Sequence, residues 1–67
     1  MVDNNLKVWR AKFDFTQEEL AKKVAVTRQT IIALEKGKYN PSVELALKIA
    51  TIFNTTVGEI FFLKEDK

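Results

Sequence analysis

Two short amphipathic segments between Thr16 and Leu34 are separated by only three residues, Ala25-Val26-Thr27. If both segments are helices, so short a connection makes them cross steeply, at roughly 90–120°. Helices that approach this closely need a small side chain at the contact, which Ala21 supplies, and apolar side chains around it. Those apolar side chains are Leu20, Val24, Val26, Ile31 and Leu34. The pattern therefore predicts two helices held at a steep angle.

Hydroxyl residues mark the places where helices begin. Thr16 opens the sequence T-Q-E-E, in which the threonine accepts a hydrogen bond from the backbone of Glu19 and the glutamate reaches back, forming a capping box. Thr56-Val57-Gly58-Glu59 repeats this pattern. Glycine can end a helix because it adopts a positive φ without steric cost, and proline biases the residue before it away from helical angles. The pattern predicts five helices that begin at Asn4 or Asn5, Thr16, Thr27, Ser42 and Thr56, of which the first ends at Phe13, the second near Lys23 and the third at Gly37.

The two chain ends differ from this helical pattern. Met1-Val2 and Ile60-Phe61-Phe62-Leu63 are apolar and flanked by charged residues. Because β-branched and aromatic side chains suit strands, we expect the ends to pair as a short antiparallel β ribbon. The predicted fold is all-α, a five-helix bundle in a single domain over residues 1–67, with this ribbon added.

The composition excludes several classes of function. The chain has no cysteine and no histidine, which excludes disulfides, thiolate metal sites and an imidazole base. Glu18 and Glu19 diverge on a helix, and the chain has no nucleophile–base pair and no phosphate-binding glycine loop. No run of about 18 apolar residues exists to span a membrane, and MVDNNLK lacks the order of a signal peptide. We expect a cytoplasmic protein that is not an enzyme and uses no cofactor, metal or small-molecule ligand.

The stretch TQEELAKKVAVTRQTIIALEKGKYNPS resembles the helix–turn–helix of the phage-repressor and Cro type, the XRE family, and the resemblance extends from about Asn5 to Phe61. The NNLK start and the EIFF end are similar to small stand-alone regulators of the cytolysin-repressor type. The resemblance implies a lambda-repressor-like DNA-binding domain, with its helix–turn–helix at about 16–36, that regulates transcription as a homodimer. The family often has glycine where this chain has Asp14, Ala25 and Asn54. A left-handed angle at Ala25 would cost roughly 1–2 kcal/mol.

In this motif the second helix, here 28–36, enters the major groove of double-stranded DNA with its N-terminal part. Ile31 and Leu34 face inward, and the opposite face carries Arg28, Gln29, Ile32 and Ala33. Gln29 can form two hydrogen bonds with adenine, and Arg28 can bind guanine or a phosphate. Ile32 has no evident role in a core, so it is either a thymine-methyl contact or an isolated apolar residue on the surface.

Further residues are candidates for phosphate contacts. Thr27 and Thr30 can each donate to a phosphate, although Thr27 is first of all a helix cap. Lys36, Lys38 and Asn40 form the following loop, which in this family runs along the DNA backbone; the alternative is an ordinary solvated loop. The resemblance also implies that Gln17 holds a phosphate and supports the recognition glutamine. Residues 1–40 contain eight basic and five acidic residues, a net charge of +3, whereas the whole chain is +2.

Arg10 and Glu35 are expected to have a structural role. Arg10 lies near the apolar stripe of Leu6, Trp9 and Phe13, and Glu35 ends the proposed recognition helix. A carboxylate near phosphates repels them unless a cation neutralises it. We therefore predict a largely internal ion pair between Arg10 and Glu35 that joins the first helix to the third.

A single recognition helix reads only a few base pairs, so two copies are expected to act together on an inverted-repeat operator. The candidate dimer interface is the segment 56–64, with the side chains of Val57, Ile60, Phe61, Phe62 and Leu63. The alternative is that Phe62 and Leu63 only cover the core of the monomer. The expected function is a transcriptional regulator, specifically a repressor. The alternative function is an antitoxin or another protein-interaction module with secondary DNA binding.

Overall fold

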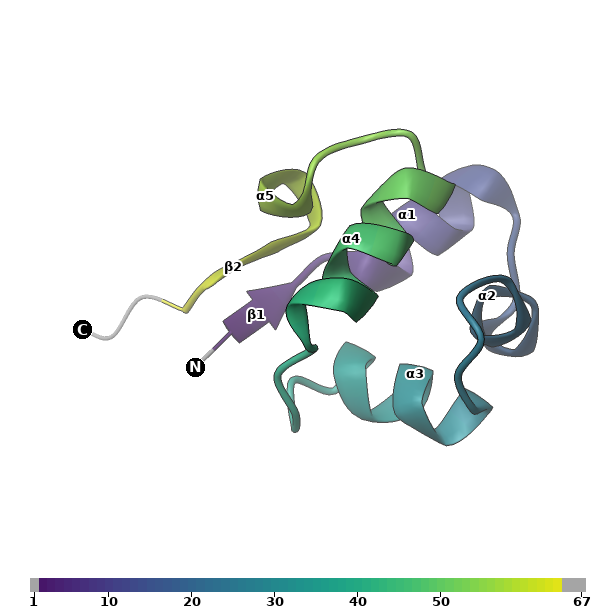
Figure 1. Ribbon diagram of the computed structural model, residues 1–67, viewed down its shortest axis with the longest axis horizontal. Coiled ribbons are helices and arrows are strands. Elements are labelled where there is room, and N and C mark those ends of the chain that lie inside the picture. Colours follow the sequence, from purple (N-terminus) through teal and green to yellow (C-terminus); the bar gives the residue numbers. More distant parts are fainter. Residues whose placement is uncertain (1, 65–67) are drawn as a thin grey trace.

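The computed structural model describes residues 2–64. Within this range the chain forms five helices and two short strands, in the order β1 (Val2–Asn4), α1 (Leu6–Phe13), α2 (Gln17–Lys23), α3 (Arg28–Glu35), α4 (Val43–Ile52), α5 (Val57–Ile60) and β2 (Phe61–Leu63). In Figure 1, α3 lies along the lower edge, α2 lies at the right, and the two strands lie toward the left. None of the helices between residues 2 and 64 is long and apolar enough to cross a membrane.

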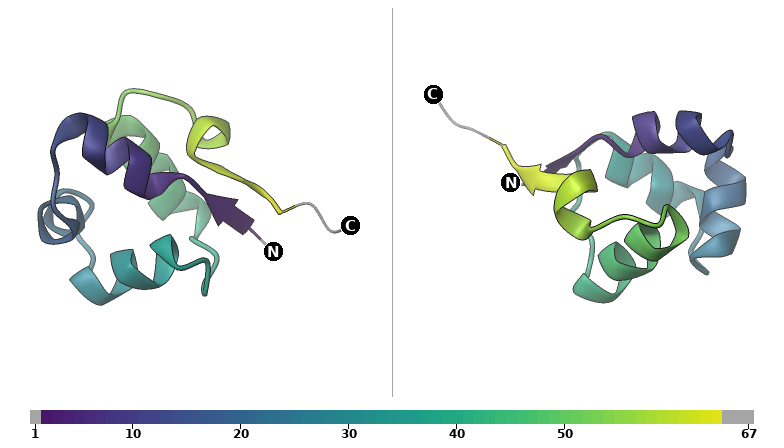
Figure 2. Two further views of the ribbon diagram at one scale, coloured as in Figure 1. Left: turned by 180° about the vertical axis from the view of Figure 1, so that it is seen from behind. Right: turned by 90° about the horizontal axis from the view of Figure 1, so that it is seen from above.

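The predicted β ribbon is present at this end of the molecule (Figures 1 and 2). The strands are antiparallel and pair Val2 with Leu63, Asp3 with Phe62 and Asn4 with Phe61. The predicted residues were partly wrong. Ile60 ends α5 instead of starting the strand, and Asp3 and Asn4 belong to β1. Met1 lies outside the described residues.

Three of the predicted helix starts are confirmed by their hydrogen bonds. The Thr16 hydroxyl accepts from the Glu19 N–H at 3.0 Å, and the Glu19 carboxylate accepts from the Thr16 N–H at 2.8 Å. The Thr16 N–H, and after it the Thr16 hydroxyl, stabilise the charged carboxylate and lower the pKa of the Glu19 carboxyl below its usual value. Thr27 and Ser42 accept in the same way from the backbone three residues further on. Because each cap satisfies a first-turn N–H that has no partner inside its helix, α2, α3 and α4 begin where predicted.

The predicted capping box at Thr56 was wrong. No side chain caps α5, which is a single turn of four residues. The Glu59 N–H donates instead to the backbone carbonyl of Thr56 at 3.1 Å. Because the Glu59 N–H is used in that bond, it does not donate to the Thr56 hydroxyl as a capping box would require.

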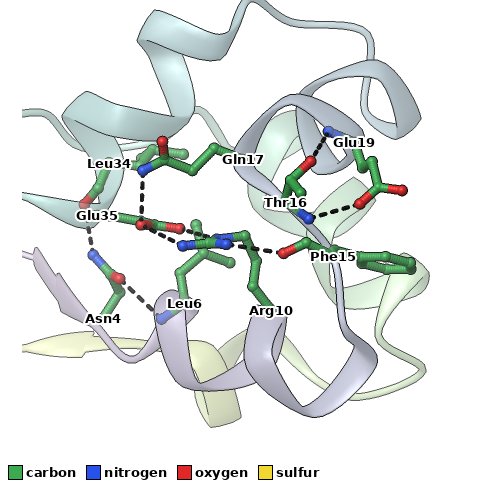
Figure 3. A network of polar contacts seen from close by, with 9 residues as sticks. All are labelled: Asn4, Leu6, Arg10, Phe15, Thr16, Gln17, Glu19, Leu34 and Glu35. Atoms are coloured by element: carbon green, nitrogen blue, oxygen red, sulfur yellow. Dashed lines mark hydrogen bonds and ion pairs between the residues drawn. The ribbon is translucent and has the colours of Figure 1, made fainter.

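α1 is capped from within the neighbouring strand. The side-chain oxygen of Asn4 accepts from the Leu6 N–H at 3.0 Å, while its amide donates to the Leu34 carbonyl at 2.7 Å (Figure 3). The helix begins at Leu6 with Asn5 at its N-cap position, as predicted. One side chain thus ties the start of α1 to α3.

The core lies between α1, α4 and the helix pair α2–α3. Its fully buried members are Leu6, Leu20, Val24, Ile31, Leu34, Ile49, Phe53 and Ile60. Trp9, Phe13 and Phe15 surround Phe53, with ring centroids 5.1–6.0 Å from it. Phe13 packs at the edge of this cluster and stays partly exposed.

Four turns use a left-handed backbone. Asp14, Ala25 and Asn54 have φ of 58°, 59° and 54°, and Gly37 has φ of 70°. Asp14, Ala25 and Asn54 are the three turn residues at which the resemblance implied such angles. Ala25 is the strained member, because alanine has no side-chain polar group to offset the contact of its Cβ with the backbone.

We expect Ala25→Gly to raise the free energy of unfolding by about 0.5–1 kcal/mol, because glycine removes roughly 1–2 kcal/mol of strain but adds entropy to the unfolded chain. The melting temperature should rise by about 3–6 °C in a domain of this size, measured by circular dichroism. The matched control is Ala11→Gly inside α1, which should lower stability by roughly 0.5–1 kcal/mol. A lower melting temperature for Ala25→Gly would contradict the left-handed turn.

Candidate nucleic-acid interface

The contact between α2 and α3 has the small and apolar side chains that the sequence predicted. Ala21 is buried where the helices meet, and Leu20, Val24, Ile31 and Leu34 are buried around it. α3 consequently turns one side to the core and the other to solvent (Figure 2, left). The residues predicted for the outer side are exposed at Arg28 and Gln29 and half-buried at Ile32 and Ala33. Ile32 lies outside the core.

The start of α3 combines a cap with free hydrogen-bonding capacity. The Thr27 hydroxyl accepts from the Thr30 N–H at 3.3 Å, and the two threonine hydroxyls lie 3.1 Å apart. A hydrogen bond between two hydroxyls uses only one of their two protons. The second proton can be donated to another group. Together with the Arg28 guanidinium and the Gln29 amide, this end of α3 presents several hydrogen-bond donors. Its one strong acceptor is the side-chain oxygen of Gln29.

The predicted ion pair between Arg10 and Glu35 is present (Figure 3). Arg10 donates from Nε and Nη2 to the two carboxylate oxygens of Glu35, the second bond at 3.1 Å, and from Nη1 to the Phe15 carbonyl at 2.9 Å. The two side chains are only 14% and 9% exposed. The pair joins α1 to the last residue of α3 and neutralises the carboxylate closest to the end of that helix.

Gln17 is the first residue of α2, and its side chain bonds within the molecule. Its amide donates to Glu35 Oε1 at 3.2 Å and completes the network around that carboxylate (Figure 3). Among residues 2–64 no hydrogen bond joins Gln17 to Gln29, so the phosphate contact and the support of the recognition glutamine remain predictions for the DNA-bound protein. The Arg10–Glu35 pair places a charged acceptor within reach of the first turn of α2.

The loop after α3 carries exposed cations. Lys36 and Lys38 are exposed, and neither forms an ion pair within the described part of the chain. Asn40 is exposed, and its side-chain oxygen accepts from the Val2 N–H at 3.3 Å. The loop is thereby connected to β1.

Tyr39 was missed by reasoning from the sequence. It lines a shallow depression of about 330 Å³ together with Gln29, Thr30 and Ala33 of α3. The only sequence signal is an exposed aromatic residue between Lys38 and Asn40 in an otherwise polar loop.

The predicted dimer residues separate into two groups. Ile60 is fully buried in the monomer core, so its assignment to an interface was wrong, whereas Phe61 is nearly buried and reaches the surface where it lines the groove described below. Val57 packs against the core and is partly buried. Phe62 and Leu63 are 46% and 77% exposed.

Two exposed residues of α4, Val43 and Leu47, were missed by reasoning from the sequence. They line an apolar groove of about 210 Å³ beside the ribbon, together with Val2, Pro41, Ser42, Ala46, Val57 and Phe61.

The steep α2–α3 pair, its short turn and the outward face of α3 define a helix–turn–helix protein. A family model described as "Helix-turn-helix" matches residues 6–60. An uncharacterized HTH-type transcriptional regulator of Archaeoglobus fulgidus is 58% identical over 92% of this chain and 87% of its own length. The chain therefore belongs to the XRE-type helix–turn–helix family.

Two further relatives extend the comparison. The cryptic phage CTXphi transcriptional repressor RstR of Vibrio cholerae is 30% identical over 90% of this chain, which spans about half of that repressor, 54%. The crystal structure of a candidate DNA-binding protein from Bacteroides fragilis superposes with a TM-score of 0.82 at 26% identity, covering 92% of this chain and all of that one. Chains that differ widely in sequence thus share this fold.

Proposed function

We propose that this protein is a sequence-specific transcriptional repressor that binds an inverted-repeat DNA operator as a homodimer. The observation that carries the proposal is the two-sided character of α3. Its inner side is fully buried at Ile31 and Leu34, whereas Arg28 and Gln29 are exposed at its N-terminal end. A rigid helix with these side chains at its free end is suited to hydrogen bonding with base edges in the major groove.

The electrostatics of this surface support a polyanionic partner. Arg28, Lys36 and Lys38 are exposed along α3 and its loop, and the carboxylate of Glu35 is neutralised by Arg10. Cations that neutralise phosphates release condensed counterions, which strengthens binding at low salt. The names of two relatives, an HTH-type transcriptional regulator and a phage repressor, agree with this function.

A homodimer would use the apolar residues that the monomer leaves exposed. Phe62 and Leu63 on β2 and Val43 and Leu47 on α4 are the candidates. Apolar residues that stay exposed on a small domain often form contacts with a partner. In a two-fold dimer the recognition helices should lie about 34 Å apart, one turn of the duplex.

Selection from random duplex DNA tests the proposed function directly. We expect an inverted-repeat consensus, bound by the purified chain alone at two protomers per duplex. Equal affinity for all sequences would contradict sequence-specific regulation. In that case the exposed apolar residues would favour the second candidate, an antitoxin-like module that needs a protein partner to find its site.

The salt dependence of binding measures the role of the loop lysines. We expect Lys36→Ala and Lys38→Ala each to make the slope of log affinity against log salt shallower by about 0.9 for each phosphate that the lysine neutralises. Affinity should fall by a similar factor on all sequences. Lys12→Ala is the matched control, because Lys12 lies on α1 over the Trp9 ring. An unchanged slope for both variants would show that the two loop lysines neutralise no phosphate and that the loop is only solvated.

A further inference from the structure

The depression beside Tyr39 opens on the face of α3 that we propose enters the major groove. Gln29 and Ala33 lie one helical turn apart and share that face, and Thr30 and the Tyr39 ring complete the walls. Tyr39 is 41% exposed, so a partner can reach its ring. The loop thus adds an aromatic wall to a surface otherwise built from one helix.

The position of this wall is determined before any partner binds. Gly37 and Lys38 donate their N–H groups to the Leu34 and Ala33 carbonyls at 3.0 and 3.1 Å, so the loop leaves α3 in a defined direction. On its other side Tyr39 borders a second depression of about 180 Å³, lined by the turn Val24-Ala25-Val26 and the start of α4. Because these two backbone bonds fix the start of the loop, less conformational entropy is lost there on binding.

The chemistry of the depression favours a small apolar group. Its lining residues are Gln29, Thr30, Ala33 and Tyr39, whose side chains offer two methyl groups, an aromatic ring and one amide. The C5-methyl of thymine is the apolar group that base pairs present in the major groove. A thymine next to the base pair that Gln29 contacts would project its methyl toward these walls.

We propose that Tyr39 and Ala33 form a pocket for one thymine methyl group in each half-site, which makes Tyr39 a specificity-determining residue outside the recognition helix. This inference rests on the proposed function, since it requires α3 to lie in the groove. It assigns the methyl readout to the ring of Tyr39, not to its hydroxyl.

Deoxyuridine substitution tests the pocket, because deoxyuridine differs from thymidine only by the methyl group. Each thymine of one half-site of the selected operator is replaced in turn, and affinity is measured for the wild type, Tyr39→Phe and Tyr39→Ala. At one thymine we expect the replacement to weaken the wild type and Tyr39→Phe about four-fold, the value for burying one methyl group. Tyr39→Ala should bind the original operator more weakly and show no further loss at that position.

The remaining outcomes separate the two proposals. Each deoxyuridine replacement could reduce the affinity of the wild type and of Tyr39→Ala by the same factor. That result would overturn the methyl pocket and leave the proposed function intact. A uniform loss of affinity in Tyr39→Phe on all sequences, with no thymine effect, would also overturn it and assign the hydroxyl to a phosphate. No selected consensus at all would contradict the proposed function itself.

A second pair of variants guards against misfolding, because Tyr39 also borders α4. If Tyr39→Ala melts at a much lower temperature, Tyr39→Gln and Ala33→Ser replace it. Both place a polar group in the depression and should abolish the dependence on the same thymine methyl. Retention of the four-fold effect in both would overturn the proposal.

Discussion

Replacing Arg10 with methionine is expected to lower the free energy of unfolding by about 3–5 kcal/mol, because it leaves a buried carboxylate without its counter-ion. Glu35 would keep only the Gln17 amide, and the Phe15 carbonyl would lose the donor that holds the turn after α1. A chain of this length has a total stability of only roughly 3–10 kcal/mol. Loss of the pair therefore removes a large part of it.

Urea unfolding followed by Trp9 fluorescence measures this effect. Trp9 is the only tryptophan, and it packs near Phe53 with its indole N–H donating to the Glu59 carbonyl at 3.3 Å. The matched control is Lys22→Met, which breaks an exposed ion pair with Glu18 and should change stability by less than about 1 kcal/mol. The double variant Arg10→Met with Glu35→Leu should recover much of the loss, because no charge is then stranded. Unchanged unfolding in Arg10→Met would refute the structural role of the pair.

The second large effect is expected on recognition and not on stability. Gln29→Ala removes an exposed side chain that makes no hydrogen bond within the described residues, so stability should change by no more than about 0.5 kcal/mol. Affinity for the selected operator should fall about 5- to 150-fold for each half-site, the range for a bidentate contact with adenine. Non-specific binding should be unchanged, because that contact carries sequence information only.

Fluorescence anisotropy with the selected operator and a scrambled duplex separates these quantities. The other glutamine of the chain provides the control. Gln17→Ala removes a hydrogen bond to Glu35, so it should cost about 1 kcal/mol of stability and leave the ratio of specific to non-specific affinity unchanged. If Gln29→Ala kept that ratio at the wild-type value, base reading by Gln29 would be excluded.

Features that depend on neighbours within a few residues were predictable from the sequence. The caps at Thr16, Thr27 and Ser42 bond to the backbone three residues further on, so their sequence pattern determines the helix starts. The left-handed angle at Ala25 was implied by the resemblance to a family that often has glycine at this turn. The outward placement of Gln29 follows from helical periodicity, because the buried residues beside it recur at helical spacing.

The Arg10–Glu35 pair and the ribbon were predicted from the sequence, but several other contacts between distant segments were decided only by the tertiary structure. Ile60 and Phe62 are chemically similar neighbours, yet one fills the core and the other faces solvent, because α5 ends where β2 begins to pair with a strand at the opposite end of the chain. Gln17 bonds to a carboxylate that α3 brings to it, and Tyr39 meets Gln29 and Ala33 because of the path of the loop. Periodicity shows which side of a helix is apolar, but which neighbour covers that side depends on how all the elements pack together.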